Sequence, residues 1–279
     1  MKRREFLRSG LVATGTARAP AREARRAADV VLLGPDKVKL SRLAISTGTK
    51  AFNKTSAQTR QLGIGGLADL LQFGFDHQLT FWDSADAYGT HSSLKEALKR
   101  VPREKVTIMT KTLARTAEAM KADLDRFRQE IGADYLDIVL LHAVSRPEWA
   151  EQRKGAMEVL SEAREKGVVR THGVSCHSLD ALKTVARTPW VRVALIRVNP
   201  AGENMDAGPD AVVAELKQIK AAGKGAIGMK ILGEGVLRNQ VDKALKYAVG
   251  LDCIDSMTIG PESRQELIEL IQKMPAVSA

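Results

Sequence analysis

Residues 81–89, FWDSADAYG, begin as an apolar strand and continue into a loop that carries Asp83, Asp86 and Tyr88. A segment with helical spacing follows at 92–100, and the next β-branched run, VTIMTK at 106–111, again ends on a charged residue. Hydrophobic periodicity of this kind predicts a strand, a short loop and a helix. The same unit recurs along the chain, and its repetition determines the fold that we predict.

Eight such units are predicted in the sequence. The strands are expected at 42–47, 79–84, 106–111, 136–142, 168–175, 191–199, 226–232 and 254–260. The helices are expected at 56–73, 92–100, 117–131, 147–166, 178–187, 209–222, 239–249 and 263–273. Strict alternation implies parallel pairing with right-handed crossovers, and eight units close a barrel. The predicted fold class is therefore α/β, a single-domain (β/α)8 TIM barrel of residues 29–279, with a small hairpin at 30–33 and 38–40 before the first barrel strand.

An open doubly wound sheet is the alternative arrangement of alternating strands and helices. Such sheets usually place a glycine-rich phosphate-binding turn directly after the first strand. The glycines of this chain, Gly63, Gly65 and Gly66, fall inside or before a predicted helix instead. Their position favours the barrel.

Composition excludes several classes of protein. The net charge is +10, but eight basic residues and only two acidic ones lie in residues 1–28, so most of the excess belongs to the N-terminus. No basic stripe interleaved with aromatic residues is present, so we expect no nucleic-acid partner. No apolar run reaches the roughly 18 residues of a membrane helix, so no membrane span is expected. The two cysteines, Cys176 and Cys253, are too far apart to indicate a disulfide framework or a CxxC metal site.

The N-terminus, MKRREFLRSGLVATGTA, resembles a twin-arginine export signal, with Arg3 and Arg4 at the core of the motif. The resemblance implies export of a folded protein to the periplasm. The alternative is a disordered basic tail on a cytoplasmic protein. In both cases residues 1–28 are excluded from the predicted barrel.

Polar residues are predicted at the C-terminal ends of the strands, where barrels of this kind carry their active sites. Asp83 ends the second strand, Lys111 the third and His142 the fourth, and Tyr88 lies in the loop after Asp83. Each residue alone has an ordinary structural explanation, such as a helix cap or a hydrogen-bonded core histidine. Together they are more informative, because Lys and Asp at the ends of apolar strands must be paired to be tolerated near a core.

This set of residue types suits one kind of chemistry. A tyrosine phenol has a pKa of about 10, and a nearby lysine ammonium favours the phenolate and is expected to lower that pKa. The aspartate would keep the lysine charged and fixed, and the histidine could orient a carbonyl oxygen. The group would protonate an oxygen as negative charge develops on it, which is what carbonyl reduction by hydride requires.

The motifs 83–89, 110–112 and 140–142 resemble the Asp/Tyr/Lys/His tetrad of the aldo-keto reductases, and the likeness extends from about Val38 to Leu270. The resemblance implies an NADPH-dependent barrel without a Rossmann domain. It implies that Tyr88 donates the proton, that Lys111 and Asp83 tune it, and that His142 positions the carbonyl of a small-molecule substrate.

The resemblance also implies a cofactor site, with NADPH preferred and NADH as the other possibility. Ser175 and Cys176 correspond to the residues that hold the nicotinamide carboxamide, and the turn at 259–263 corresponds to the one that receives the adenosine phosphate. The full set of expected cofactor residues comprises Ser175, Cys176, Asn199, Met229, Lys230, Gly260, Ser263 and Arg264, of which Arg264 is the candidate for the 2′-phosphate.

Some of these positions depart from the family pattern. Cys176 stands where asparagine is frequent, Leu195 and Val198 stand where many members have glutamine and tyrosine, and Met229 replaces an aromatic residue that stacks on the nicotinamide. The Met-Lys pair resembles a divergent branch, some of whose members carry an iron–sulfur domain. The sequence has no cysteine cluster, so no iron–sulfur cluster and no metal are predicted.

Two other functions stay open at this stage. A metal-dependent barrel hydrolase could use ligands from the set His91, His142, His172, His177, Asp83 and Asp86, although no HxH or HExxH pair is present. A barrel that binds cofactor without catalysis is the other, motivated by the altered nicotinamide contacts. The substrate and the oligomeric state are not determined by the sequence, and Asp86 is interpreted as a loop residue without a catalytic role.

Overall fold

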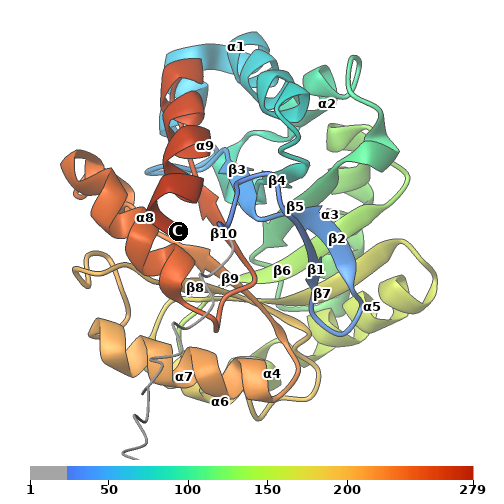
Figure 1. Ribbon diagram of the computed structural model, residues 1–279. Coiled ribbons are helices and arrows are strands. Elements are labelled where there is room, and N and C mark those ends of the chain that lie inside the picture. Colours follow the sequence, from blue (N-terminus) through green and yellow to red (C-terminus); the bar gives the residue numbers. More distant parts are fainter. Residues whose placement is uncertain (1–23, 279) are drawn as a thin grey trace, which may run out of the picture.

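The computed structural model describes residues 24–278 and shows a closed barrel of eight strands surrounded by helices (Figure 1). The barrel strands are β3 (Leu43–Ser46), β4 (Phe81–Asp83), β5 (Thr107–Thr112), β6 (Leu136–Val144), β7 (Val169–Cys176), β8 (Val193–Arg197), β9 (Gly225–Met229) and β10 (Ser256–Ile259). Every neighbouring pair is parallel, and Met257 opposite Leu43 closes β10 onto β3. The predicted (β/α)8 fold is confirmed.

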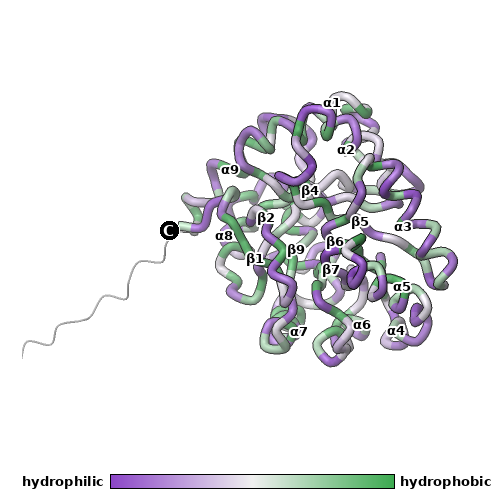
Figure 2. Tube along the Cα trace, turned by 90° about the vertical axis from the view of Figure 1, so that its right-hand side faces the viewer, coloured by the Kyte–Doolittle hydropathy of each residue, from purple (hydrophilic) through white to green (hydrophobic). Residues whose placement is uncertain are grey.

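The helices form the outer ring (Figure 2). They are α1 (Ala57–Asp76), α2 (His91–Ala97), α3 (Ala117–Ile131), α4 (Trp149–Gln152), α5 (Lys154–Glu165), α6 (Leu179–Val185), α7 (Pro209–Ala221), α8 (Val241–Gly250) and α9 (Arg264–Ser278). Short 3-10 helices lie at η1 (Asp86–Tyr88), η2 (Arg103–Lys105), η3 (Gly233–Gly235) and η4 (Arg238–Gln240). The glycine-rich segment lies inside α1, where Gly63 introduces a kink.

One predicted helix differs from the structure. The segment 147–166 was expected to be continuous, but α4 and α5 are separated at Arg153, whose φ of −121° and ψ of 18° are not helical. The break turns the chain at a residue that is itself only 6% exposed. Periodicity alone did not indicate it, because the apolar spacing on both sides is helical.

Two apolar layers follow from the alternation of side chains along each strand. Phe81, Met109, Leu140 and their counterparts on other strands fill the barrel interior, whereas Trp82 and its counterparts pack between strands and helices. One end of the barrel is closed by the antiparallel hairpin of β1 (Val30–Leu33) and β2 (Val38–Ser41), which confirms the predicted hairpin. Its residues Leu33, Val38 and Leu40 belong to the interior layer.

The barrel also contacts the chain before its expected start at residue 29. Ala27 is buried, and its carbonyl accepts a hydrogen bond from Leu43 N at 3.0 Å. The paired arginines of the predicted export signal lie outside the described residues. Within residues 24–278, no helix combines the length and the apolar character needed to cross a membrane.

A glycine at the β7–β8 contact generates a prediction on stability. Gly173 lies opposite Val193, and a Cβ at this position would overlap the Val193 carbonyl group. Because backbone on a neighbouring barrel strand cannot move aside, Gly173→Ala should lower the free energy of unfolding by about 3 kcal/mol. Urea denaturation measures this difference.

The matched control is Gly65→Ala on the exposed surface of α1, where a Cβ would meet nothing within 4 Å. This substitution should raise the free energy of unfolding by about 0.5 kcal/mol, because alanine favours the helix. Equal stability of the two variants would contradict the packing that we describe between β7 and β8.

Candidate active site

Strand alternation brings the predicted catalytic residues to one end of the barrel interior. Asp83 lies two residues beyond Phe81, Lys111 two beyond Met109 and His142 two beyond Leu140, and those three apolar residues all line the interior. The last inward-facing side chain of each strand therefore points into the same rim. The structure thus places Asp83, Lys111 and His142 together, and the loop after β4 adds Tyr88.

Lys111 is completely buried and makes three contacts through its ammonium group. Its Nζ forms an ion pair with Asp83 Oδ1, and donates to Ser84 O at 2.7 Å and to Tyr88 Oη at 3.3 Å. A buried charge is tolerated only when it is paired and hydrogen-bonded, and these contacts meet that requirement. Burial alone would lower the pKa of Lys111, but Asp83 and Tyr88 more than offset it and leave that pKa raised.

The other oxygen of Asp83 is also satisfied. Thr258 Oγ1, on β10, donates to Asp83 Oδ2 at 2.7 Å. The carboxylate thereby connects β4 with β5 on one side and with β10 across the interior. Thr258 was not predicted from the sequence, although the alternation of side chains along β10 makes it face the barrel interior.

Tyr88 lies in η1 with its ring beside the ammonium of Lys111, whose Nζ is 4.6 Å from the ring centroid. The ring packs against the backbone of Gly48, where a Cβ would collide with it. Burial raises the pKa of the Tyr88 phenol, and the positive charge of Lys111 opposes this rise without cancelling it. The sequence had led us to expect a lowered pKa. Because the pKa is raised instead, the phenol is protonated at neutral pH and releases its proton less readily than a lowered pKa would allow.

His142 faces Tyr88 edge-on, with ring centroids 5.9 Å apart, and His177 lies at the same distance on its other side. Burial first, and then the charges of Lys111 and other cations, lower the pKa of His142 well below its ordinary value. The imidazole is therefore neutral. The strand is irregular just after it, because the β6–β7 register shifts between Leu141 and Val144 and Ala143 has a φ of 54°. Bulges of this kind are frequent beside active sites, where they re-aim a side chain.

A cavity of about 480 Å³ extends from these residues along β9 and β10. Its lining includes Asp83 and Tyr88, Met229 and Lys230, and the segment from Gly260 to Glu262. Of the predicted cofactor residues, the structure brings Met229, Lys230 and Gly260 to this cavity. Burial and the charge of Arg197 lower the pKa of Lys230 to about 8, while Glu234 forms an ion pair with its ammonium.

Ser175 stays a predicted cofactor residue, and it is not among the residues that line this cavity. Its side chain is fully buried on β7, and within residues 24–278 its Oγ has no hydrogen-bond partner. A buried hydroxyl without a partner is costly, and an amide group of a ligand would satisfy it. The adjacent Cys176 differs, because its side chain belongs to the apolar layer between strands and helices. Burial raises the pKa of its thiol.

The remaining predicted cofactor residues are engaged within the protein. Asn199 Nδ2 donates to Glu203 O at 2.7 Å and to Lys230 O at 3.1 Å, so its amide fixes the loop after β8. Ser263 Oγ accepts from Glu266 N at 3.2 Å at the start of α9. The guanidinium of Arg264 lies over the ring of Phe73, 5.1 Å from its centroid.

One further residue of the rim, Arg197, was not identified from the sequence. Arg197 follows Val193 and Leu195 in the inward register of β8, and that parity was the available signal. It contacts His177 Nδ1 and forms an ion pair with Asp206 Oδ1 at 3.2 Å. Burial and the charge of Arg197 lower the pKa of His177 to about 3.

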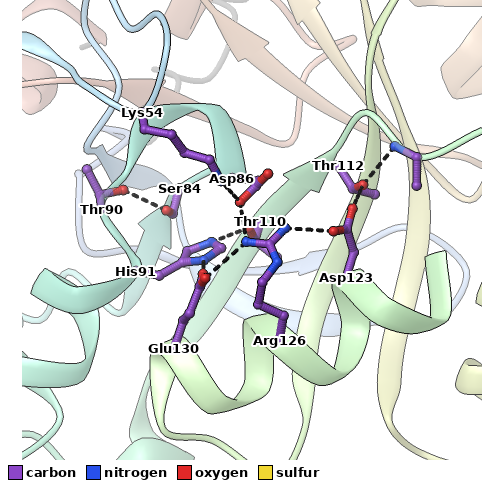
Figure 3. A network of polar contacts seen from close by, with 11 residues as sticks. Lys54, Ser84, Asp86, Thr90, His91, Thr110, Thr112, Asp123, Arg126 and Glu130 are labelled. Atoms are coloured by element: carbon purple, nitrogen blue, oxygen red, sulfur yellow. Dashed lines mark hydrogen bonds and ion pairs between the residues drawn. The ribbon is translucent and has the colours of Figure 1, made fainter. Parts of the chain in front are cut away.

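The ligand types of the rival metal site gather elsewhere. Among the described residues, one group offers ligand atoms within 4.8 Å of one another, namely Asp86, His91 and Glu130. Figure 3 shows Arg126 beside this group, where it donates to Asp86 Oδ1 at 2.7 Å and to Glu130 Oε1 at 3.0 Å. Lys54 forms an ion pair with Asp86 as well. Both carboxylates are thus paired with cations of the protein, and through Asp86 the network anchors η1, the segment that carries Tyr88.

Comparison with known proteins agrees with this geometry. The sequence model of the Aldo/keto reductase family matches residues 44–251. An aldo-keto reductase of Mycobacterium avium is 32% identical over 152 residues, which cover 50% of this chain and 47% of the relative. The NAD/NADP-dependent indole-3-acetaldehyde reductase of Schizosaccharomyces pombe is 27% identical over 176 residues, covering 61% and 59%.

The chain thus spans about half the length of the curated relatives that it matches. Among solved structures, a protein of Pseudomonas aeruginosa that carries the aldo-keto reductase name superposes with a TM-score of 0.74 at 17% identity, over 93% of this chain and 99% of the other. This likeness supports the fold. With the family match covering most of the barrel and the tetrad assembled at its rim, the chain belongs to the aldo/keto reductase family.

Proposed function

We propose that this protein reduces the carbonyl group of a small aldehyde or ketone to an alcohol, with Tyr88 as the general acid. The observation that carries the proposal is the ammonium of Lys111, which pairs with Asp83 and lies 3.3 Å from Tyr88 Oη. Membership of a family of oxidoreductases supports the reaction class.

In this proposal each residue has a role that follows from its protonation state. Tyr88 is protonated because burial raises its pKa, so its phenol donates a hydrogen bond and then a proton to the carbonyl oxygen. Lys111 stays charged and stabilises the phenolate that forms. Neutral His142 supplies a second hydrogen bond that orients the same oxygen. A reduced nicotinamide, when bound, supplies the hydride to the carbonyl carbon.

The cofactor would occupy the cavity along β9 and β10. Ser175, with its unpartnered hydroxyl, would bind the nicotinamide carboxamide, and Met229 would lie against the ring in place of an aromatic side chain. We propose NADPH as the preferred form. In this proposal Arg264 turns from Phe73 toward the cavity and offsets the repulsion between a 2′-phosphate and the lining residues Glu262, Glu266 and Glu269.

We also propose that the protein is exported to the periplasm with its cofactor bound. The proposal rests on the twin-arginine motif, which lies outside the described residues.

Replacing the proposed acid should abolish reduction selectively. Tyr88→Phe removes the transferable proton and keeps the ring, so kcat/KM for a reactive aldehyde should fall about 10²- to 10⁴-fold. Affinity for NADPH, measured by fluorescence titration, should stay within about two-fold. Tyr247→Phe is the matched control and should retain wild-type activity. Undiminished reduction by Tyr88→Phe would exclude Tyr88 as the acid. If the wild-type protein binds NADPH but reduces no aldehyde, the barrel binds cofactor without catalysis.

The pH dependence of reduction should have one alkaline limb. Because reduction needs protonated Tyr88 and burial raises the pKa of that phenol, the rate should hold through neutral pH and fall only above about pH 10. Steady-state kcat/KM measured between pH 6 and about 11 tests this. A decline that begins near neutrality would contradict the protonation state assigned to Tyr88.

Cofactor preference can be tested at Arg264. Titration of the protein with NADPH and NADH should show tighter binding of NADPH, and Arg264→Gln should weaken NADPH binding about ten-fold without changing NADH binding. Arg187→Gln, another exposed arginine, is the matched control for net charge. Tighter binding of NADH by the wild type would overturn the proposed NADPH preference while leaving the reductase function in place.

The proposed location can be tested at the paired arginines. Substitution of Arg3 and Arg4 by lysine should retain the protein in the cytoplasm, and fractionation of expressing bacterial cells measures the distribution. Cytoplasmic retention of the unsubstituted chain would contradict the proposal.

A further inference from the structure

A second cavity, of about 270 Å³, opens beside the active site between the ends of β5 and β6 and helix α4. We call it the arginine pocket. It is lined by Arg115, Ala143, Val144, Ser145, Arg146, Trp149, Gln152 and Arg153. Three of the eight lining residues carry permanent positive charge and none is acidic, so the pocket is electropositive.

Arg153 is the most unusual member of this group. The residue is 94% buried, being only 6% exposed, and within residues 24–278 its Nη1 has no hydrogen-bond partner. Other buried or half-buried arginines of the barrel are paired, as Arg103 is with Asp137 and Arg192 with Asp36. Burial and the nearby charge of Arg115 lower the pKa of Arg153 to about 10, so the guanidinium is charged at neutral pH.

The Arg153 side chain lies at a break between two helices. The helix expected over 147–166 is broken at Arg153, whose non-helical backbone separates α4 from α5. Arg115 and Arg146 approach from two different loops and are exposed, and no described carboxylate forms an ion pair with any of the three arginines. A buried unpaired guanidinium is costly in a folded protein, and a bound anion would remove that cost.

The chemistry of the pocket specifies the ligand group. Guanidinium groups form paired, charge-assisted hydrogen bonds with the oxygens of phosphate and carboxylate. The pocket shares no lining residue with the larger cavity along β9 and β10. The anion is therefore not the pyrophosphate of a cofactor bound in that cavity.

The pocket adjoins the reacting end of the site. Ala143 and Val144, which line it, directly follow His142, the residue that orients the carbonyl. The charge of Arg153 also acts on His142, where it is one of the causes that lower the pKa of the imidazole. One small molecule could therefore place its carbonyl at Tyr88 and His142 and its anionic group among the arginines.

We propose that the arginine pocket binds a phosphate or carboxylate group carried by the carbonyl substrate, so that the protein acts on anionic aldehydes or ketones. This substrate class rests on the proposed carbonyl reduction, whereas the anion site itself can be tested without it.

The first experiment measures binding alone. Inorganic phosphate and succinate are titrated separately into the full protein and followed by calorimetry. At least one should bind, and Arg153→Gln should weaken its affinity about ten-fold or more, because a charge-assisted contact to a buried group is lost. Arg115→Gln, at an exposed position that leaves the core intact, should weaken binding as well. Arg187→Gln, which changes the net charge equally on another face, should have no effect.

The second experiment measures specificity. Reduction of glyceraldehyde 3-phosphate, of succinic semialdehyde and of neutral butanal is compared by kcat/KM. One anionic substrate should exceed butanal about ten-fold or more, and Arg153→Gln should remove the advantage mainly through KM. The two anionic substrates distinguish phosphate from carboxylate recognition.

The outcomes separate the two proposals. Suppose that no aldehyde is reduced, but that phosphate or succinate binds and Arg153→Gln weakens that binding. The proposed carbonyl reduction is then wrong and the proposed anion site is supported. If neither anion binds to the wild type, or if the anionic preference persists in both Arg153→Gln and Arg115→Gln, the arginine pocket is overturned and the reductase function is unaffected.

Discussion

The buried ion pair between Lys111 and Asp83 is the interaction on which the rest of the site depends. A lysine ammonium inside a barrel is tolerated only with a carboxylate and further acceptors around it, and here Asp83, Ser84 O and Tyr88 Oη supply them. Thr258 holds the second oxygen of Asp83. Strands β4, β5 and β10 are thereby joined through one carboxylate, so the position of Lys111 beside Tyr88 depends on closure of the barrel.

The surroundings then assign a separate protonation state to each group. Lys111 keeps its charge because its partners outweigh burial, whereas His142 is neutral because burial and neighbouring cations disfavour a second charge. Tyr88 stays protonated because burial outweighs the attraction of Lys111. The loop that carries Tyr88 is held from outside by the network of Asp86, Arg126 and Glu130, so a group that resembles a metal site acts as an anchor.

The rim is also divided in space. The cavity of about 480 Å³ along β9 and β10 includes Asp83 and Tyr88 in its lining, and the arginine pocket beside β5 and β6 is lined by three arginines and by no acidic residue. Tyr88 lines the first of these cavities, and His142 directly precedes Ala143 and Val144, which line the second. Under the functions proposed above, a hydride donor would bind in the first cavity and the anionic group of the substrate in the second.

The sequence by itself determined the barrel through local periodicity, whereas the tetrad was predicted from the resemblance of three short motifs to those of a known family. Strand alternation fixes which side chains face inward, so Asp83, Lys111 and His142 could be assigned to one rim before any contact was known. Burial and contacts between distant segments could be decided only by the tertiary structure. In the structure, Cys176 lies in the apolar layer between strands and helices, and a predicted helix is interrupted at Arg153. The pKa of Tyr88 is raised, where a lowered pKa was expected. Desolvation depends on what surrounds a group in three dimensions, and residues adjacent in sequence do not reveal it.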